Sequence, residues 1–477
     1  MSYFLGIDLG TSYFKAAIFD QEGSLQGMGR QFVEKYSDKG IICELEVYNF
    51  WKILRCCIED ALKESKRLPE DILAISYSSQ ANSFILLDQN DRPLTPLILW
   101  PDSRADEHSE SLRILVNKKN FLDRTGLGIT PWRQNAIAKI EWIQKYRVQT
   151  WNKVSKIMSI SDYLIYSLTG EFVSDVSTSS MTGLLNLRES KWWDDALSLF
   201  NILPTQLPVP LEIGALVGNL TRKGAEVSGL PSNVRLFTGG LDHHMVAIGS
   251  GAIHSGYISE STGTVLACVN CTAEYNPRNG INVARGASQH SYFQMAFDEN
   301  GATSLEWYRK NYAPHISITD LVKQAGLIAP CADGLIARPN SCTFHGLEGF
   351  INRTNNHGDA HYIRAILEST ALSLLKLVQT LEGKQSADAI LPSGGGANSR
   401  LWLEIKANLL NKPFLIPESV ELACKGAAMI CAVGLSYFDN LEEVTKRQVK
   451  LKEKVNPDLA ESKVYRIWYN SIKNDLI

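Results

Sequence analysis

The sequence is short of cysteine, of net charge and of long apolar runs, and each shortage excludes a class of protein. Nine cysteines among 477 residues are an odd, widely spread set, which favours free thiols in a reducing cytoplasm. The net charge is −3 with both signs mixed throughout, so no extended field attracts nucleic acid or an anionic membrane. The apolar run Phe4–Ile7 is too short for a signal peptide or a membrane span. We expect a cytoplasmic protein without nucleic-acid or membrane partners.

Metal-binding patterns are equally scarce. Cys268 and Cys271 form one Cys-x-x-Cys, but no second cysteine pair or histidine pair lies at zinc spacing. We interpret this pair as small buried side chains of a strand. His243 and His244 are adjacent and lack further ligands, so they do not predict a zinc site either.

Length and composition predict two globular domains. A chain of 477 residues exceeds what one core usually supports, and 44% hydrophobic with 21% charged residues is an ordinary globular composition. A cleft between two domains is then a natural place for a ligand.

The first twenty residues alternate apolar, β-prone segments with a polar turn. Tyr3–Leu9 and Phe14–Phe19 are joined by Gly10, Thr11 and Ser12, which predicts a β-hairpin. A glycine permits close backbone approach, so the turn amides can face an anion while the two hydroxyls add donors. The alternative is that the turn has no function beyond reversing the chain.

Asp8, just before this turn, favours the functional interpretation. Mg²⁺ prefers one or two carboxylates and keeps several waters, so Asp8 can hold a hydrated Mg²⁺ against phosphates. Asp-x-Gly-Thr followed by a second strand resembles the first phosphate motif of the actin, hexokinase and heat-shock ATPase superfamily. It is not a P-loop, because no Gly-Lys-Ser/Thr opens a helix.

The same pattern recurs midway along the chain, where a strand from Tyr257, a turn at Gly263 and Thr264, and a second strand follow one another. A second phosphate-facing hairpin implies that the two halves share one architecture, with a nucleotide held between them.

A third glycine-rich segment follows the strand that begins at Ala389. The strand breaks into three glycines, of which Gly395 and Gly396 precede Asn398 and a helix. Such a break lets backbone lie against a flat base and phosphate at a helix N-terminus. The alternative is a flexible linker.

Two further strand ends carry side chains suited to a sugar. Gln80 and Asn82 follow one buried strand, and Trp100, Asp102 and Arg104 follow another. Carboxylate accepts and guanidinium donates hydrogen bonds, while an indole offers a flat face for a carbon skeleton. The alternatives are a solvated loop for the first segment and, for the second, an Asp–Arg bridge that caps the helix that follows.

Asp242 lies where a strand broken by Gly239 and Gly240 meets a helix. Taken alone, an acidic residue in this place is explained by capping of the helix.

Taken together, these segments resemble the FGGY carbohydrate kinases over nearly the whole chain. The motifs, in the order of the family, are Gly6-Ile-Asp8-Leu-Gly-Thr-Ser12, Trp100-x-Asp102-x-Arg104, Lys139-x-x-Trp142, Ser161-Asp-Tyr-Leu-x-x-x-Leu-Thr-Gly170, Gly239-Gly-x-Asp242, Gly263-Thr264, Arg364-Ala-x-x-Glu368 and Gly394-Gly-Gly-x-x-Ser-x-x-Trp402. The resemblance implies an α/β fold with two ribonuclease-H-like domains of the actin and hexokinase type around a central cleft. The sugar-binding domain would span residues 1–247 and the ATP-binding domain residues 248–477.

The resemblance also implies a role for each candidate residue. Asp242 would be the general base, and Asp8 the carboxylate on the Mg²⁺ side. The residues implied to bind ATP are Gly10, Thr11, Ser12, Gly263, Thr264, Gly395, Gly396 and Asn398. Those implied to bind the sugar are Gln80, Asn82, Trp100, Asp102, Arg104 and His243.

Four departures from the family pattern concern the sugar loops and the second phosphate turn. Xylulokinase-like members carry Gln-Met-His where this chain has Gln80-Ala81-Asn82, and Asn where it has His243. The Arg-Glu pair of the glycerol kinases is absent, and the second phosphate turn continues with Val265 instead of Ser. Asn82 and His243 can still hydrogen-bond hydroxyls.

We therefore expect ATP- and Mg²⁺-dependent phosphorylation of a terminal hydroxyl of a small sugar, such as a pentulose, or of a polyol. The alternative is an ATP-binding conformational module of the actin and heat-shock type without a sugar acceptor. The sequence leaves a homodimer open.

Overall fold

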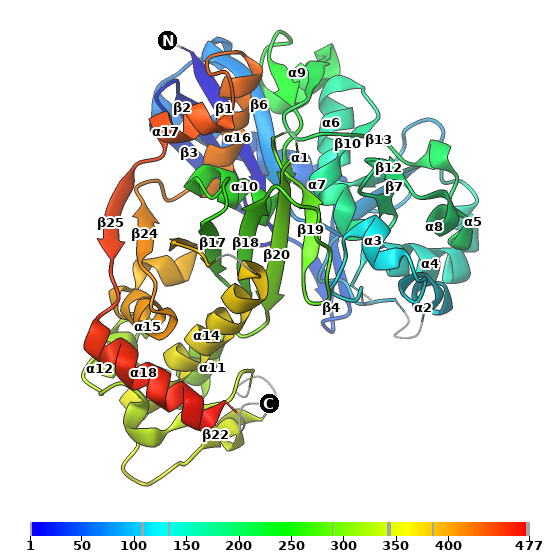
Figure 1. The fold of residues 1–477 in the computed structure, drawn as a ribbon. Helices are drawn as coiled ribbons and strands as arrows, with labels where there is room; N and C mark the ends of the chain where they lie inside the picture. Colours follow the sequence, from blue (N-terminus) through cyan, green and yellow to red (C-terminus); the bar gives the residue numbers. More distant parts are fainter. Residues whose placement is uncertain are drawn as a thin grey trace. The chain divides into compact units, whose positions relative to one another are not determined.

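The computed structural model describes residues 2–105, 109–131, 134–288, 290–340, 345–383 and 386–473. The chain divides into two compact units (Figure 1). Unit 1 comprises Met1–Ile253, Cys271–Gln294 and Glu421–Val449; unit 2 comprises His254–Asn270, Met295–Val420 and Lys450–Ile477. Each unit thus combines segments that are distant in the sequence. The domain boundary after residue 247 stays a prediction.

The main sheet of unit 1 is built around the predicted N-terminal hairpin. Its strand order is β14-β15-β6-β1-β2-β3, and β16 also pairs with β6. The strands are β1 (Tyr3–Leu9), β2 (Tyr13–Asp20), β3 (Leu25–Phe32), β6 (Ile72–Ser79), β14 (Leu216–Asn219), β15 (Arg235–Phe237) and β16 (Gly240–Leu241). The β1–β2 pair is antiparallel and places Asp8 opposite Lys15, whereas β1 and β6 are parallel.

A second sheet of unit 1 carries the loops expected to bind a sugar. Its order is β4-β5-β8-β7-β9, with β4 (Tyr36–Asp38), β5 (Ile42–Leu45), β7 (Phe84–Leu87), β8 (Leu97–Ile98) and β9 (Lys156–Ser159). Short strand pairs join β10 (Val173–Asp175) to β13 (Val209–Leu211) and β11 (Leu185–Asn186) to β12 (Lys191–Trp192). The segment β19 (Asn282–Arg285) also lies in unit 1.

The helices of unit 1 are α1 (Val47–Ser65), α2 (Glu110–Val116), α3 (Phe121–Thr125), α4 (Ala136–Tyr146), α5 (Val148–Trp151), α6 (Ile160–Thr169), α7 (Val176–Ser179), α8 (Asp194–Leu199), α9 (Arg222–Ser228), α10 (Asp242–Ser250), α16 (Leu422–Gly434) and α17 (Leu441–Gln448). Helices α1, α10 and α16 contact the main sheet of unit 1, and α6 contacts strands of both sheets. The sequence predicts the first helix over Glu44–Ser65, but the structure starts it at Val47. The preceding residues up to Leu45 form β5, whose backbone pairs with β8.

Unit 2 repeats the strand topology of unit 1. Its sheet includes the order β20-β18-β17-β23-β24-β25, in which β17–β18 is antiparallel and β17–β23 parallel. The order β3-β2-β1-β6 in unit 1 has the same pattern. The strands are β17 (Tyr257–Thr262), β18 (Leu266–Thr272), β20 (Tyr292–Asp298), β23 (Ala389–Ser393), β24 (Phe414–Pro417) and β25 (Leu451–Val455). The prediction that both halves share one architecture is confirmed.

The remaining elements of unit 2 are the pair β21 (Ile336–Ala337) and β22 (Phe350–Ile351) and five helices among the described residues. The helices are α11 (Thr303–Tyr312), α12 (Ile318–Ala325), α14 (Asp359–Glu382), α15 (Arg400–Leu410) and α18 (Leu459–Ile472). The sequence of Glu442–Lys454 is rich in charge, which predicts a solvated face; the structure places most of α17 and most of β25 here. The β25 side chains up to Lys454 are exposed while its backbone pairs with β24. Cys268 and Cys271 are free, buried side chains of β18, as predicted.

Within the described ranges, no helix has both the length and the apolar sequence needed to cross a membrane.

In unit 1, helices α10 and α16 pack so closely that their backbones approach each other. Helix α16 contacts α10, β1 and β6 (Figure 1). A Cβ atom built at Gly249 of α10 would lie 2.0 Å from the carbonyl oxygen of Leu422, and one at Gly426 of α16 would lie 2.2 Å from that of Met245. The two helices therefore approach closely only because these positions lack a side chain.

We expect Gly249→Ala to lower the free energy of unfolding by about 1–3 kcal/mol, because the added methyl group must displace backbone atoms of α16. Chemical denaturation followed by circular dichroism measures this change. The control is Gly358→Ala, where a Cβ meets nothing within 4 Å and φ is −99°. An equal effect of both substitutions would contradict the packing argument.

Candidate functional site

The predicted magnesium-side carboxylate, Asp8, lies in a group of charges contributed by four segments of unit 1. Its Oδ1 accepts a hydrogen bond of 2.9 Å from the Ser78 hydroxyl on β6. Its Oδ2 lies 3.7 Å from the Lys15 ammonium on β2, which also donates to Glu421, the residue before α16, over 2.7 Å. The Asp8 residue is 9% exposed.

The pKa of Asp8 is raised to about 6, mainly by burial; Lys15 and the Ser78 hydrogen bond oppose this rise, and the negative charges of Asp242 and Glu421 add to it. Burial disfavours the charged form of Lys15, but its two carboxylate neighbours outweigh this and raise its pKa. Asp8 thus has two negatively charged neighbours, Asp242 and Glu421, and one positively charged neighbour, Lys15. Such an excess of negative charge suits a bound cation.

Asp242 is the first residue of α10 and is partly exposed. The residue at the N-cap position is Leu241, whose side chain makes no capping hydrogen bond. One carboxylate oxygen accepts from the amide of His243 over 2.8 Å. The other makes no hydrogen bond within the described part of the chain. The geometry therefore favours a carboxylate free to act on a ligand over the capping alternative. His243 is partly exposed beside it.

The first predicted phosphate turn needs its glycine. A Cβ at Gly10 would lie 2.7 Å from the carbonyl oxygen of Tyr13. The amides of residues 10–12 make no hydrogen bond within the described part of the chain, and Ser12 is exposed. The hydroxyl of Thr11 already has two partners, because it accepts from the Trp100 indole over 2.6 Å and donates to Gln80 over 3.4 Å. The free amides are therefore the better anion donors.

Gln80 joins this turn to the predicted sugar loop. Its amide nitrogen donates to the carbonyl oxygens of Leu9 and Gly10, both over 3.3 Å. Its oxygen accepts from Ser83 over 3.0 Å, and Ser83 in turn accepts from the amide of Trp100 over 2.8 Å. Gln80 is 3% exposed, so its hydrogen-bonding groups are used inside unit 1.

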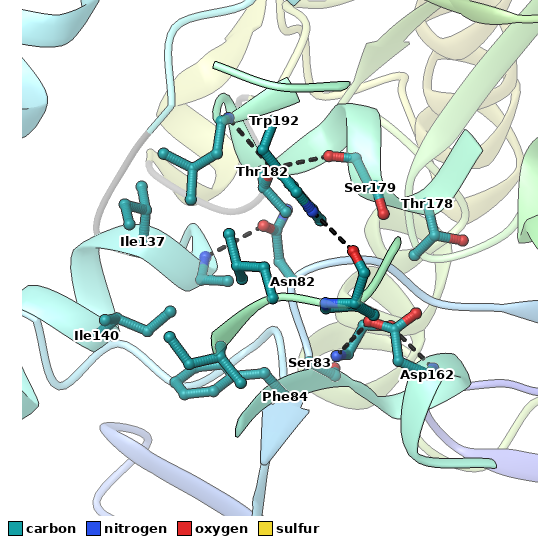
Figure 2. Close-up of a pocket in the computed structure, with 16 residues that line it drawn as sticks. Asn82, Ser83, Phe84, Ile137, Ile140, Asp162, Thr178, Ser179, Thr182 and Trp192 are labelled. Carbon is teal, nitrogen blue, oxygen red and sulfur yellow. Dashed lines mark hydrogen bonds between the residues drawn. The ribbon is translucent and has the colours of Figure 1, made fainter. Parts of the chain in front are cut away.

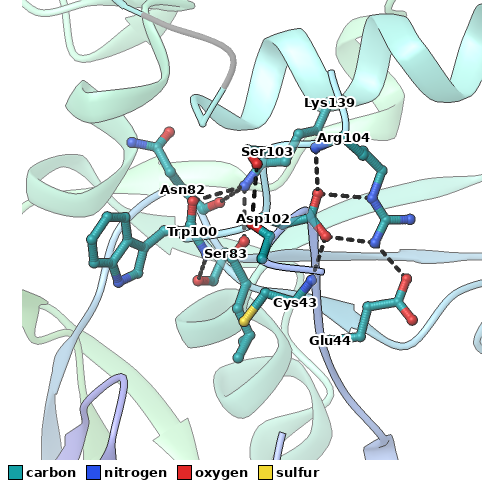
Figure 3. Close-up of polar contacts among 11 residues, drawn as sticks. Cys43, Glu44, Asn82, Ser83, Trp100, Asp102, Ser103, Arg104 and Lys139 are labelled. Atoms are coloured by element: carbon teal, nitrogen blue, oxygen red, sulfur yellow. Dashed lines mark hydrogen bonds and ion pairs between the residues drawn. The ribbon is translucent and has the colours of Figure 1, made fainter. Parts of the chain in front are cut away.

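Asp102 and Arg104 form a closed structural pair (Figure 3). Asp102 is fully buried and accepts from the amide of Cys43 over 2.7 Å. Arg104 donates to both Asp102 oxygens, over 2.8 and 2.7 Å, and to Glu44 over 2.6 Å. This geometry favours the alternative of an Asp–Arg bridge, which holds the Trp100 loop against β5.

Lys139 of α4 makes hydrogen bonds to backbone carbonyl oxygens of both predicted sugar loops (Figure 3). Its buried ammonium donates to the carbonyl oxygens of Asn82 and Leu99, both over 3.0 Å, and to that of Trp100 over 3.5 Å. Burial lowers its pKa to about 7; the Asp102 charge opposes this and Arg104 adds to it.

Asn82 has a left-handed backbone, with φ of 59°, and its side-chain oxygen accepts from the amide of Ala136 over 3.1 Å. On one side it borders a cavity of about 50 Å³ with a mainly apolar wall. Figure 2 shows Ile137, Ile140 and Trp192 in this wall. Neither Asp8 nor Asp242 lines the cavity, and its wall offers little to a polyhydroxylated ligand.

The second phosphate turn lies in unit 2. Gly263 is partly exposed and Thr264 exposed. The amide of Gly263 donates to Val265 over 3.1 Å, and its carbonyl oxygen accepts from Ala302 over 2.8 Å. The turn is thus fixed between β17 and β18 while the Thr264 side chain faces solvent.

The third glycine segment is ordered as the sequence predicts. After β23, Gly394 adopts φ of 73°, and a short 3₁₀ helix, η6 (Gly395–Asn398), leads into α15. Gly395 and Asn398 are exposed and Gly396 is buried. The linker alternative does not describe this ordered turn.

The structure therefore links Thr11, Gln80 and Trp100 through hydrogen bonds and places the charge of Asp242 near Asp8. It keeps Asp102 and Arg104 beneath that network. The sequence analysis missed Lys15 and Glu421. Lys15 could have been found, because a hairpin turning at residues 10–12 sets it opposite Asp8.

No cluster of three or more His, Cys, Asp or Glu side chains able to hold a metal occurs in the described ranges. Mg²⁺ needs only one or two carboxylates. Asp8, with excess negative charge around it, fits that requirement.

Comparison with known proteins supports one family. The models for the FGGY family of carbohydrate kinases match residues 3–249 (N-terminal domain) and 295–435 (C-terminal domain). The chain is 28% identical to a xylulose kinase of Lactococcus lactis subsp. lactis (strain IL1403), covering 99% of this chain and 97% of that one. It is 27% identical to a gluconokinase of Bacillus subtilis (strain 168), covering 93% and 90%.

A crystal structure of gluconate kinase from Lactobacillus acidophilus superposes with a TM-score of 0.87 at 22% identity, covering 100% of this chain and 98% of that one. This likeness confirms the expected two-domain α/β fold of the actin and hexokinase type. Because the two family models together match well over half of the sequence, the chain belongs to the FGGY family of carbohydrate kinases.

Proposed function

We propose that this carbohydrate kinase transfers the terminal phosphoryl group of ATP to a terminal hydroxyl of a ketose, a polyol or a related small sugar. The observation that carries the proposal is Asp242, which begins α10 with one carboxylate oxygen free and lies near the charge of Asp8. Two similar proteins are named as a xylulose kinase and a gluconokinase, and these names support a small carbohydrate as the substrate.

In the proposed reaction, Asp242 accepts the proton of the sugar hydroxyl while the oxygen of that hydroxyl forms a bond to the terminal phosphorus of ATP. The bond between this phosphorus and the ADP oxygen breaks, and ADP leaves. Phosphoryl transfer depends mainly on positioning and charge stabilisation. A carboxylate base is typically worth about 10² to 10⁴ in rate. The hydrogen bond from the His243 amide fixes the Asp242 side chain for this task.

We propose Asp8 as the residue that would hold Mg²⁺, with Lys15 as a second cation for the phosphates. Bound Mg²⁺ would neutralise phosphate charge. Ser78 and Glu421 keep these two side chains in place through the hydrogen bonds described above.

For the sugar, we propose direct contacts from Asn82, His243 and the face of Trp100. Gln80, Asp102 and Arg104 act on the substrate indirectly, because their polar groups are bound within unit 1. ATP binding is assigned to the turns at Gly10, Thr11 and Ser12 and at Gly263 and Thr264, and to Gly395, Gly396 and Asn398.

We further propose a cytoplasmic location, since the cysteines of the described ranges are free thiols. A homodimer stays a prediction. The alternative of a conformational module without an acceptor is not supported, because the family is one of carbohydrate kinases.

The experiment that tests the proposal measures ADP release by the full chain across ketopentoses, ketohexoses, pentitols, aldonates and glycerol. We expect release that depends on one of these classes. Equal ADP release with and without every acceptor would contradict the proposed substrate class.

Asp242→Asn should lower kcat by about 10² to 10⁴, because the amide keeps the shape but cannot accept the proton. ATP affinity, measured by isothermal titration calorimetry, should stay within about twofold. The control is Asp195→Asn, which changes an exposed carboxylate on α8. Turnover retained in Asp242→Asn would remove this residue from the role of base.

We expect the titration of Lys139 to make the KM for the sugar depend on pH. With its pKa near 7, its ammonium group is charged below that pH and neutral above it, where its bonds to the loop carbonyls weaken. We expect KM for the sugar to rise severalfold between pH 6.5 and about pH 8.5.

Lys139→Met should give a high KM for the sugar that does not change with pH over this range, while KM for ATP changes little. Steady-state kinetics at several pH values measures both constants. An unchanged pH profile in Lys139→Met would show that another group titrates.

A further inference from the structure

The two nucleotide segments assigned to unit 2 both rest on one residue, Thr262, at the end of β17. Thr262 directly precedes the Gly263–Thr264 turn. A Cβ built at Gly396 would lie 2.7 Å from the Cβ of Thr262, and one at Gly394 would lie 2.9 Å from its carbonyl oxygen. The position of Thr262 therefore sets both the phosphate turn and the glycine segment.

The side chain of Thr262 is held by a fully buried ion pair. Its hydroxyl donates to Oε1 of Glu260 and accepts from Nζ of Lys406 over 2.7 Å. Lys406 on α15 also donates to the same Glu260 oxygen over 3.0 Å. Both charged side chains are 0% exposed.

These three groups connect three elements of unit 2. Glu260 and Thr262 lie on β17, and Lys406 reaches them from α15, with its ammonium 4.7 Å from the Trp402 ring centroid. The hydroxyl of Ser393, at the end of β23, donates to the Glu260 carbonyl oxygen over 2.9 Å. The two strands that precede the nucleotide segments, β17 and β23, are thus both joined to α15, the helix that follows the second segment.

A buried ion pair is a poor device for stability alone, because desolvation offsets most of the attraction between the charges. Oε2 of Glu260 is buried without a hydrogen-bond partner in the described part of the chain, which adds to that penalty. Hydrophobic side chains of similar size could fill the space. Unlike apolar side chains, the ion pair makes directional hydrogen bonds to the Thr262 hydroxyl.

We propose that Lys406 and Glu260 are a positioning pair for nucleotide binding, which acts by fixing the orientation of Thr262. The inference rests on the proposed function, in which the segments at Gly263–Thr264 and Gly395–Asn398 bind ATP. Neither Lys406 nor Glu260 contacts the nucleotide, because both are enclosed in the core of unit 2. Their effect is on ATP affinity and not on the sugar.

The test uses Thr262→Val, which keeps the branched shape beneath Gly396 but removes the hydroxyl. We expect the Kd for ATP·Mg²⁺, measured by isothermal titration calorimetry on the full chain, to rise about tenfold. Thr262→Ser retains the hydroxyl and should stay within about twofold of the wild type. A similar rise in Kd in both variants would overturn the role of the hydroxyl.

A control variant separates positioning from general loosening of unit 2. Tyr465→Phe removes the hydroxyl that bonds to Arg364 over 2.7 Å and to Glu368 over 2.8 Å in another buried charge cluster. We expect it to lower the melting temperature without changing the Kd for ATP·Mg²⁺. If Tyr465→Phe weakens ATP binding as much as Thr262→Val, the pair is only structural.

The double variant Glu260→Met, Lys406→Met removes both charges together with both hydrogen-bond partners of the Thr262 hydroxyl, so no lone charge is left buried. It should remain folded by circular dichroism and weaken ATP binding as Thr262→Val does. Wild-type ATP affinity in this folded variant would overturn the proposal.

Binding is measured without any sugar, so the inference and the proposed function can fail separately. If the wild type binds ATP but phosphorylates no sugar, the proposed substrate class fails while the affinity series still decides on Lys406 and Glu260. If the wild type does not bind ATP, both are overturned.

Discussion

The organisation of unit 1 depends on one electrostatic constraint, the excess of negative charge around Asp8, whose charged neighbours are the Lys15 ammonium and the carboxylates of Asp242 and Glu421. Asp8 comes from β1, Asp242 from α10 and Glu421 from the residue before α16, and burial keeps this charge from being screened by water. Glycines let α10 and α16 approach at backbone distance, which fixes these groups in place. Unbalanced negative charge beside a turn with free backbone amides would suit a cation and phosphates together, which is the basis of the proposed nucleotide site.

The functional loops are held by buried polar groups more than by apolar packing. In unit 1, Lys139 bonds three loop carbonyls beneath the Asn82 and Trp100 segments. In unit 2, Lys406 donates hydrogen bonds to the side chains of Glu260 and Thr262, which precede the predicted phosphate turn. Each unit thus has a buried lysine that hydrogen-bonds a predicted ligand-binding loop or the strand that precedes it. Such groups fix orientation through directional bonds, which catalysis by positioning requires.

Much of this arrangement could be predicted from local sequence. The hairpins at Asp8–Lys15 and at Gly263 are visible because strand alternation and turn residues act over a few neighbours. The burial of Asp102, the role of Lys139 and the return of α16 to unit 1 were not predictable in this way. Each depends on contacts between residues far apart in the chain, such as Asp102 with the Cys43 amide, and a local pattern does not encode those partners.

The central claim is that a sugar hydroxyl, and not water, receives the phosphoryl group under the action of Asp242. The most direct measurement runs the reaction in oxygen-18 water with the most active acceptor and analyses the products by mass spectrometry. The account predicts one sugar phosphate per ADP, with no oxygen-18 in its phosphoryl group. Inorganic phosphate carrying oxygen-18, formed at the same rate as ADP, would contradict it.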